Sequence, residues 1–457
     1  MFLPINGRIA IIDNEEKEAL PLIKILSKNR VPYVFYKGTD INYLPEEKDE
    51  SNDIRLIFLD INLLNNASPS VQEIKSTLYS VLKRVISPNN FPYSIIFWSK
   101  QENEYSDAVI DLFNEQLSDR KPINFQKFIK SDFFPNYGDE ETENEKDLIT
   151  EINTIISNQP GYSYLLNWEN QVHKSTDKTL QNVFSSYHEY PNWNDNSNYI
   201  INKLGESYSG RVNFSKNLSE EQKIMNAFQA FNNVFFDSLE FSTSNSPITN
   251  AENLTYDIGK INTANLNSIN TKLLISFDNE PIEYPGSISN DTNPKSDTYF
   301  SDLLNNSLNR SFLKEKVKSE NTEKTPKQIE VLTGKIAKET RQKIRESWLK
   351  SYVVVTPLCD YVQNKNFNHR VVKAIMIKSE FKQFIDDKSE AIFITPKFKF
   401  SETDYILVLN FRYFFTSNKP DGLKYISPMF RVRQQLLAEI QSKLARHITR
   451  QGVLFIE

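Results

Sequence analysis

The feature that most constrains the fold is an apolar segment near the amino terminus, residues 54–63, which reads IRLIFLDINL. Its centre, LIFL, has no polar side chain to offer to water, which is typical of a strand in a parallel sheet that is covered on both faces. Asp60 follows this run directly. In open α/β sheets, ligands bind at the edge formed by the carboxyl ends of the strands. The segment therefore predicts a parallel sheet with a carboxylate at its ligand-binding edge.

Four further segments have the same apolar character, and helical patterns such as 15–27 and 71–86 separate most of them. These predicted strands are Arg8–Asp13, Val31–Lys37, Tyr93–Ser99 and Phe125–Lys130. Asn14 and Glu15 follow the first strand, so two strand ends bring together the oxygen ligands that Mg²⁺ prefers. Residues 38–53 are too polar and too few for an ordinary amphipathic helix, and we expect the second helix to be degenerate.

The ends of four predicted strands carry Asp13, Asp60, Ser99 and Lys130, in that order along the chain. These residues make the first 135 or so residues resemble a response-regulator receiver domain. The resemblance implies an α/β, doubly wound, flavodoxin-like domain with five parallel strands in the order 2-1-3-4-5. It makes Asp60 the phosphoacceptor and implies Mg²⁺ held by Asp13 and Asp60, with Asn14 or Glu15 in the place of the family's second acid. It also assigns a switch hydroxyl to Ser99 and a phosphoryl-pairing ammonium to Lys130.

The chemistry of such a site requires these residue types. A carboxylate that attacks a phosphorus atom surrounded by negative oxygens needs a metal ion and an ammonium to spread the developing charge. The sequence departs from the family at Asn14, at Ser131, where receivers usually have proline, and at Lys127, where many have an aromatic residue. The alternative is a receiver fold that takes no phosphate and acts as a docking scaffold.

Length and composition predict more than one domain. At about 150 residues a domain, 457 residues predict three, and we place them at 1–158, 159–349 and 350–457. The net charge of −5 gives no overall field that would attract nucleic acid. One cysteine, no signal peptide and no apolar run of membrane-spanning length lead us to expect a cytoplasmic protein.

The middle region is predicted to be mainly helical. An apolar face repeats with helical spacing through residues 162–239. Residues 242–309 are rich in Asn, Ser, Thr and Asp, which is typical of long loops or partial disorder. In residues 314–350, glutamates interleave with lysines and arginines, and we interpret this segment as a helix exposed to water rather than a basic arm for nucleic acid.

The carboxyl-terminal region is predicted to be β-rich. Strands at 352–356, 370–377, 391–400 and 405–415 precede a long helix at 428–449. A metal or hydrolytic site could be formed there by Cys359, Asp360, His369 and His447. Because no ligand pair has a zinc-site spacing, we favour a buried structural cysteine and surface histidines. The arginines of the last helix keep nucleic-acid binding open as an alternative function.

The order of these regions over the whole chain resembles receiver-bearing proteins of bacterial anti-phage phosphorelays of the Detocs type. That resemblance implies a histidine kinase or other phosphodonor as partner, a downstream effector protein, and a role as intermediate or phosphate buffer. A homodimer stays open, and no membrane partner is expected. The chain has no phosphate-binding GxxxxGK[ST], GxSxG or GxGxxG motif. We therefore expect a signalling phosphoacceptor rather than a turnover enzyme.

Overall fold

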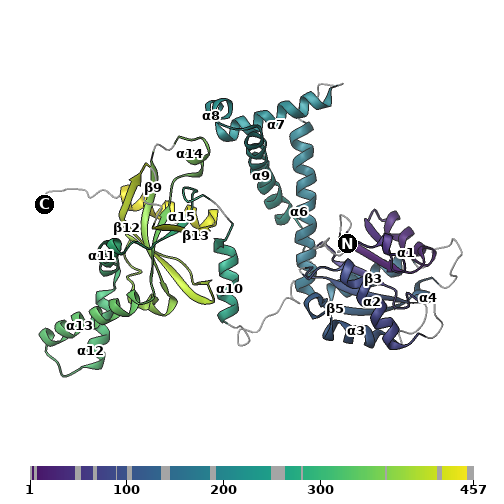
Figure 1. Cartoon of the computed structure of the whole chain (residues 1–457), viewed down its shortest axis with the longest axis horizontal. Helices are drawn as coiled ribbons and strands as arrows, with labels where there is room; N and C mark the ends of the chain where they lie inside the picture. Colours follow the sequence, from purple (N-terminus) through teal and green to yellow (C-terminus); the bar gives the residue numbers. More distant parts are fainter. Residues whose placement is uncertain are drawn as a thin grey trace. The chain divides into compact units, whose positions relative to one another are not determined.

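The computed structural model divides the chain into two compact units. The first comprises Met1–Ser197 and Phe231–Tyr256, and the second comprises Asn198–Ala230 and Asp257–Glu457. The structure describes residues 3–4, 8–46, 53–64, 69–88, 90–99, 105–134, 145–185, 192–246, 248, 263–278, 281–365, 368–418 and 425–449. Figure 1 shows the elements of both units along the chain. The three-domain division with boundaries at 158 and 349 stays a prediction.

The first unit contains a five-stranded, all-parallel sheet in the order β2-β1-β3-β4-β5, which confirms the predicted α/β class. This is the strand order of flavodoxin-like folds. Its strands are β1 (Ile9–Asp13), β2 (Tyr33–Lys37), β3 (Leu56–Leu59), β4 (Ser94–Ser99) and β5 (Asn124–Ile129). The strand predicted within residues 54–63 is β3, and it ends directly before Asp60, as the sequence predicts.

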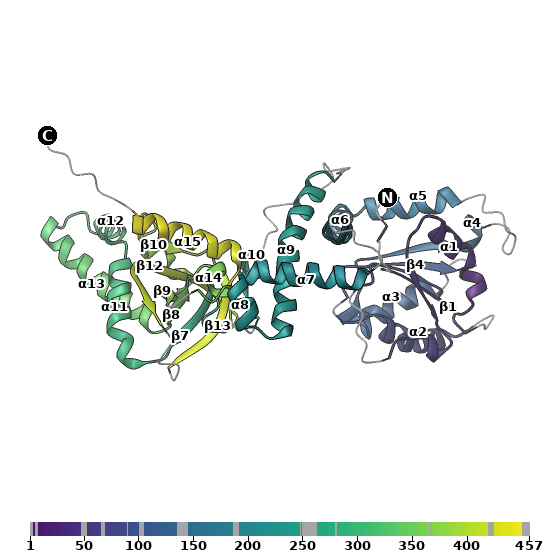
Figure 2. The same ribbon diagram turned by 90° about the horizontal axis from the view of Figure 1, so that it is seen from above.

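Helices cover both faces of this sheet, so each face has its own apolar core (Figure 2). One core packs against α1 (Glu16–Lys28) and α5 (Glu145–Ser157), and the other against α2 (Val71–Val85) and α3 (Ser106–Glu115). A short helix, α4 (Lys130–Phe133), follows β5 at once. Between β2 and β3 the described residues form only one 3₁₀ turn, Ile41–Tyr43, as expected for a degenerate second helix; residues 47–52 lie outside the described ranges.

The middle of the chain is helical, as predicted. Its helices are α6 (Pro160–Ser185), α7 (Trp193–Ser209), α8 (Arg211–Lys216), α9 (Glu220–Ser244) and α10 (Thr263–Leu274). Helix α6 is held to the amino-terminal edge of the parallel sheet, where Glu169 binds both Arg8 and Arg55. The Arg55 guanidinium donates from Nε and Nη2 to this carboxylate at 3.0 Å each, and the Tyr162 hydroxyl donates to the Arg55 carbonyl. These contacts make α6 part of the first unit.

Replacing Glu169 with glutamine is expected to lower the free energy of unfolding of the first unit by about 1–3 kcal/mol, because two half-buried guanidinium groups lose their shared carboxylate. The measurement is hydrogen exchange of the β1 and β3 amides. The control is Asp177→Asn, an exposed acid on the same helix, for which we expect a change within about 0.5 kcal/mol. Equal protection in the two variants would show that this ion pair does not hold α6.

The second unit is built on an eight-stranded antiparallel sheet in the order β10-β12-β9-β8-β7-β13-β6, with β11 paired to β12. Its strands are β6 (Ile275–Ser276), β7 (Ser287–Asp291), β8 (Leu349–Val354), β9 (His369–Lys378), β10 (Ile392–Ile394), β11 (Phe398–Phe400), β12 (Thr403–Ser417) and β13 (Ile426–Val432). Helix α15 (Gln434–Thr449) covers one face (Figure 2). The predicted β-rich region with a final helix is therefore present.

Three details of this prediction are wrong. The polar segment 242–309 contributes β6 and β7 to the sheet, because β7 is buried between β8 and β13. The helix expected from residue 428 begins at Gln434, since residues 426–432 pair with β7 as strand β13. The strand expected over 391–400 is divided into β10 and β11, which pair with different parts of β12.

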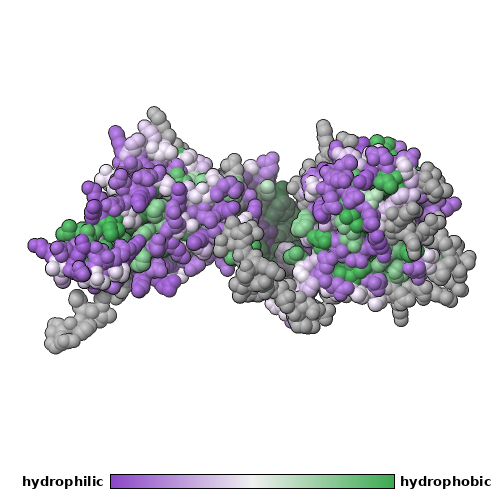
Figure 3. Space-filling view, turned by 90° about the horizontal axis from the view of Figure 1, so that it is seen from below, coloured by the Kyte–Doolittle hydropathy of each residue, from purple (hydrophilic) through white to green (hydrophobic). Residues whose placement is uncertain are grey.

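Between β7 and β8 lie the helices α11 (Asp297–Ser307), α12 (Arg310–Glu320) and α13 (Pro326–Arg345). Helix α13 and most of α12 fall in the charged segment 314–350, and most of their side chains are exposed, in agreement with the interpretation of this segment as water-facing. The segment forms two helices and the start of β8 rather than one helix. Hydrophilic residues cover most of the surface of each unit on the face drawn in Figure 3. Of the helices in the described ranges, none combines the length and the apolar character needed to cross a bilayer.

Candidate functional site at the carboxyl edge of the parallel sheet

Two neighbouring strands each deliver a buried aspartate to the carboxyl edge of the parallel sheet. Asp13 is the last residue of β1 and is fully buried, and Asp60 follows β3 and is 6% exposed. The backbone N–H of Asp60 donates to the Ile12 carbonyl at 2.8 Å, so the ladder between β1 and β3 continues to the aspartate. The register of this ladder therefore brings Asp60 beside Asp13.

Each aspartate is oriented by a backbone N–H group two residues further along the chain. Asp13 Oδ1 accepts a hydrogen bond from the Glu15 N–H at 3.0 Å, and Asp60 Oδ1 accepts one from the Asn62 N–H at 3.1 Å. Such local turns are common for aspartate and hold the side chain in one rotamer. The Oδ2 atoms of the two aspartates both remain directed at a third side chain, that of Lys130.

Lys130 carries the ammonium of the site, and its side chain is completely buried. Its Nζ atom lies 2.8 Å from Asp13 Oδ2 and 3.4 Å from Asp60 Oδ2. A third carboxylate, that of Glu18 in the first turn of α1, contacts the same Nζ atom at 3.4 Å. Three carboxylates against one ammonium leave a formal charge of −2 when all four groups are ionised.

An aromatic cluster fixes the backbone that carries Lys130. Helix α4 begins at this lysine, and the next turn places Phe133 and Phe134 against Trp98 of β4, with ring centroids 6.1 and 5.9 Å apart. Phe128 of β5 packs against Phe133 at 4.9 Å. Because rigid neighbours on both sides hold the start of α4, the ammonium is positioned between the carboxylates without needing a long flexible reach.

The charges in this buried cluster oppose one another. Burial, together with the Asp13 and Glu18 carboxylates, raises the pKa of Asp60 to about 6 against the opposing effect of the Lys130 ammonium. Burial likewise raises the pKa of Asp13. For Lys130, burial disfavours the ammonium, but the charges of Asp60 and Asp13 outweigh burial and the pKa is raised. Lys130 is therefore positively charged, but its single charge does not balance the three carboxylates.

This shortage of positive charge fits a divalent cation. One carboxylate oxygen from each of Asp13, Glu18 and Asp60 lies within 4.8 Å of the others, and in the described part of the chain this is the one such group of acids, histidines or cysteines. Carboxylate oxygens are the ligands that Mg²⁺ takes, and its charge of +2 matches the formal −2 of the cluster. The residues present could therefore hold Mg²⁺.

Several residues predicted from the sequence have different places in the structure. Asn14 is buried directly after Asp13, whereas Glu15 is exposed and contributes its backbone N–H to Asp13. The metal-binding roles of both stay predictions. Ser99 ends β4 opposite Ile129 of β5, and its side chain lies outside the described residues.

Glu18 is the member of the site that the sequence reasoning missed. It precedes Leu22 by one helical turn, at the start of the stripe of α1 that packs on the sheet. Its side chain is therefore only 16% exposed and faces the strand ends. An acid at the beginning of an otherwise apolar helical stripe is the sequence signal that points to it.

The candidate residues of the carboxyl-terminal region are not brought together as a metal cluster. Cys359 is exposed, so the interpretation as a buried structural cysteine is wrong. Asp360 contacts the thiol of Cys359 at 3.7 Å and the guanidinium of Arg370 at 3.5 Å. His447 lies on α15 beside Phe411, while His369 begins β9 and lines a separate hollow.

Comparisons of the chain with protein-family models, with curated proteins and with solved structures gave no match.

Proposed function

We propose that this protein is a phosphoacceptor of a two-component-like signalling relay and accepts a phosphoryl group on Asp60 with Mg²⁺. The observation that carries the proposal is the buried ammonium of Lys130, placed 2.8 Å from one strand-end aspartate and 3.4 Å from the next. Buried charges are seldom kept without a function that needs them, because their desolvation costs several kcal/mol. The strand order 2-1-3-4-5 supports the same proposal.

The phosphoryl transfer would proceed at the Asp60 carboxylate. One carboxylate oxygen forms a bond to the phosphorus of the donor, and the bond between that phosphorus and the donor's leaving atom breaks, with its electron pair going to the leaving group. With a pKa of about 6, Asp60 is mainly ionised at pH 7 and can act as the nucleophile. Lys130, already in contact with Asp60, stays protonated and pairs with the charge that develops on the phosphoryl oxygens.

Asp13, Glu18 and Asp60 would hold the Mg²⁺ ion. When bound, the ion supplies positive charge that offsets the repulsion between an anionic donor and the anionic site. Asp13 and Glu18 also keep Lys130 in place through their contacts with its Nζ atom. Ser99, at the end of β4, is proposed as the hydroxyl that hydrogen-bonds the new phosphoryl group.

The wider setting we infer is a phosphorelay of anti-phage defence, in which a histidine kinase donates a phosphoryl group to Asp60 and an effector protein responds. The succession of α/β unit, helices, antiparallel sheet and terminal helix is the feature that supports this setting, since the resemblance to receiver-bearing phosphorelay proteins rests on that order of regions. A histidine-kinase gene beside the gene for this protein is the expected genomic observation.

Incubation with acetyl phosphate and Mg²⁺ is expected to add the mass of one phosphoryl group to the intact protein. Asp60→Asn should abolish the addition, because an amide cannot form the acyl phosphate. The matched control is Asp111→Asn, an exposed acid on α3 that should leave it unchanged. A wild-type protein that stays unmodified both with acetyl phosphate and with a histidine kinase would contradict the proposal and leave the docking scaffold as the function.

A further inference from the structure

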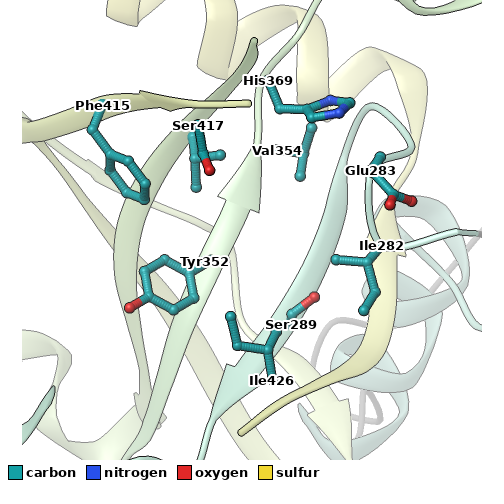
Figure 4. Close-up of a pocket in the computed structure, with 10 residues that line it drawn as sticks. Ile282, Glu283, Ser289, Tyr352, Val354, His369, Phe415, Ser417 and Ile426 are labelled. Atoms are coloured by element: carbon teal, nitrogen blue, oxygen red, sulfur yellow. The ribbon is translucent and has the colours of Figure 1, made fainter. Parts of the chain in front are cut away.

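A hollow lies in the antiparallel sheet of the second unit, on the face opposite α15. Helix α11 covers one end of this face through Phe300, Leu303 and Leu304. Beyond α11 the face contains a cavity of about 180 Å³ (Figure 4). Its wall residues come from β7, β8, β9, β12 and β13, together with the loop before β7. The cavity does not involve the phosphoacceptor site.

The register of the sheet explains which side chains line this cavity. Val354 pairs with Val371 across β8 and β9, and Val371 pairs with Phe415 across β9 and β12. Directly paired residues point to the same face of a sheet. These apolar side chains form one side of the hollow, and Ile282 and Ile426 lie on another side in Figure 4. The interior is therefore mainly apolar.

Two aromatic rings give the cavity a shape suited to a flat ligand. The rings of Tyr352 and Phe415 meet edge to face, with centroids 6.0 Å apart and planes at 78°. The Tyr352 hydroxyl donates to Asp291 Oδ2 at 2.9 Å, which holds its ring in one orientation. A dry cavity of about 150 Å³ accommodates a benzene molecule. At about 180 Å³, this one has room for an aromatic ring of similar size, extending toward the opening.

The polar residues of the cavity favour a ligand without phosphate. Hydroxyl groups of Ser289 and Ser417 line it, and Glu283 and His369 lie on the same side of the hollow in Figure 4. Among the described residues that line the hollow, Glu283 carries the one carboxylate, and no lysine or arginine is present. A phosphate group beside Glu283 would meet its carboxylate, whereas an amino group could donate a hydrogen bond to it. Two cations near the walls lie over aromatic rings: Lys373 Nζ is 5.9 Å from the centroid of the Phe415 ring, and the Arg431 guanidinium is 5.6 Å from that of Tyr284.

Glu283 and His369 also line an adjoining hollow, which is rich in amide groups. The side chains there include Asn213, Asn217 and Gln222, and no lysine or arginine lines it within the described chain. Amide side chains donate and accept hydrogen bonds with uncharged polar groups. A ligand with its ring in the sheet cavity could thus place a neutral, hydroxyl-bearing part in this second hollow.

We propose that the cavity on this sheet face binds an unphosphorylated nucleoside with an amino-bearing base. The base lies in the apolar part against Phe415, its amino group faces Glu283, and the sugar hydroxyls face the amide-rich hollow. The size of the cavity, its two rings and the single carboxylate among its lining residues lead to this ligand class. The proposal is independent of phosphoryl transfer at Asp60.

The test is calorimetric titration of the full chain with adenosine, cytidine, inosine and adenosine 5′-monophosphate. We expect adenosine or cytidine to bind, inosine, which carries an oxo group in place of the amino group, to bind at least about tenfold more weakly, and the monophosphate to bind more weakly than adenosine. No binding of adenosine and cytidine at millimolar concentration overturns the proposal. Binding of the monophosphate as tight as that of adenosine, or tighter, also overturns it.

Two substitutions, with a third as a control, test whether the nucleoside binds in this cavity. Ser417→Trp fills the cavity and should abolish binding, whereas Thr416→Trp, at the neighbouring exposed position of β12, should leave the affinity unchanged. Glu283→Gln should reduce adenosine affinity about tenfold and reduce the preference over inosine. Thermal unfolding of each variant confirms that the unit is folded. Adenosine binding that is unaffected by both Ser417→Trp and Glu283→Gln places the ligand elsewhere and overturns the proposal.

Discussion

Replacing Lys130 with methionine is expected to lower the free energy of unfolding of the first unit by about 3–5 kcal/mol at pH 7.5, because the change leaves buried carboxylates without their cation. Methionine nearly preserves the volume of the side chain, so the loss reports the charge rather than a cavity. It should also abolish phosphorylation by acetyl phosphate, since no ammonium remains to pair with the phosphoryl oxygens.

The measurement is urea unfolding combined with hydrogen exchange of the β1 and β3 amides, since the chain has two units and global unfolding need not be one transition. Lys127→Met is the matched control. This lysine lies on β5, three residues before Lys130, but it is half exposed. Its contact with Asp107 at 3.5 Å is a surface ion pair that contributes less than about 1 kcal/mol. Equal stability of the two variants would falsify the structural role assigned to Lys130.

The stability lost in Lys130→Met is expected to depend on pH. Without the ammonium, the carboxylates of Asp13 and Asp60 have pKa values raised further, because only burial and mutual repulsion remain to act on them. Protonation at lower pH relieves that repulsion, so the deficit relative to the wild type should be smaller at pH 5 than at pH 7.5. A deficit of the same size at both values would point to lost packing instead.

Mg²⁺ is expected to stabilise the wild-type protein strongly at pH 7.5 and weakly at pH 5. The pKa of Asp60 in the folded protein is about 6, above its ordinary value of 3.8. Between these values the folded chain keeps a proton that the unfolded chain has released, so the free energy of unfolding falls as the pH rises through this window. The fall is about 3 kcal/mol, from about 1.4 kcal/mol for each pKa unit.

Above pH 6 the ionised Asp60 becomes available to a cation. Mg²⁺ at a hundred times its dissociation constant then stabilises the folded state by about 2.7 kcal/mol. Thermal unfolding at both pH values, with and without Mg²⁺, measures this effect. In Asp60→Asn we expect a smaller Mg²⁺ response and greater stability than the wild type at pH 7.5 without Mg²⁺, because the buried charge is gone.

Substitutions of two glutamates test which side chain supplies the third ligand of the Mg²⁺ ion. Glu18→Gln should weaken the Mg²⁺ response, because its carboxylate is one of the three that converge. Glu15→Gln, at an exposed position three residues earlier, should leave the response unchanged. The opposite ranking would mean that the metal binds on the outer side of Asp13. An equal Mg²⁺ response at pH 5 and pH 7.5 would show that Asp60 is not a ligand.

Much of the first unit could be predicted from local sequence. Apolar runs of four to six residues define five strands, and all five are found. The places of Asp13 and Asp60 follow from them, because the carboxyl ends of parallel strands share one edge.

In the second unit the same reasoning missed β7, SISND, which has one strongly apolar residue. Its burial comes from β8 and β13, which pair with it from 58 or more residues further along the chain.

The sequence alone determined which residue types stand at the strand ends, because the alternation of apolar runs and polar turns is a local property. Tertiary structure decided how they are used. Only the packing of α1 on the sheet turns Glu18 toward Asp13 and Asp60 and leaves Glu15 in water. Only the aromatic contacts of α4 bury Lys130 among these carboxylates. Burial and spacing of charges, which set their pKa values and their affinity for a cation, depend on contacts between segments far apart in the chain.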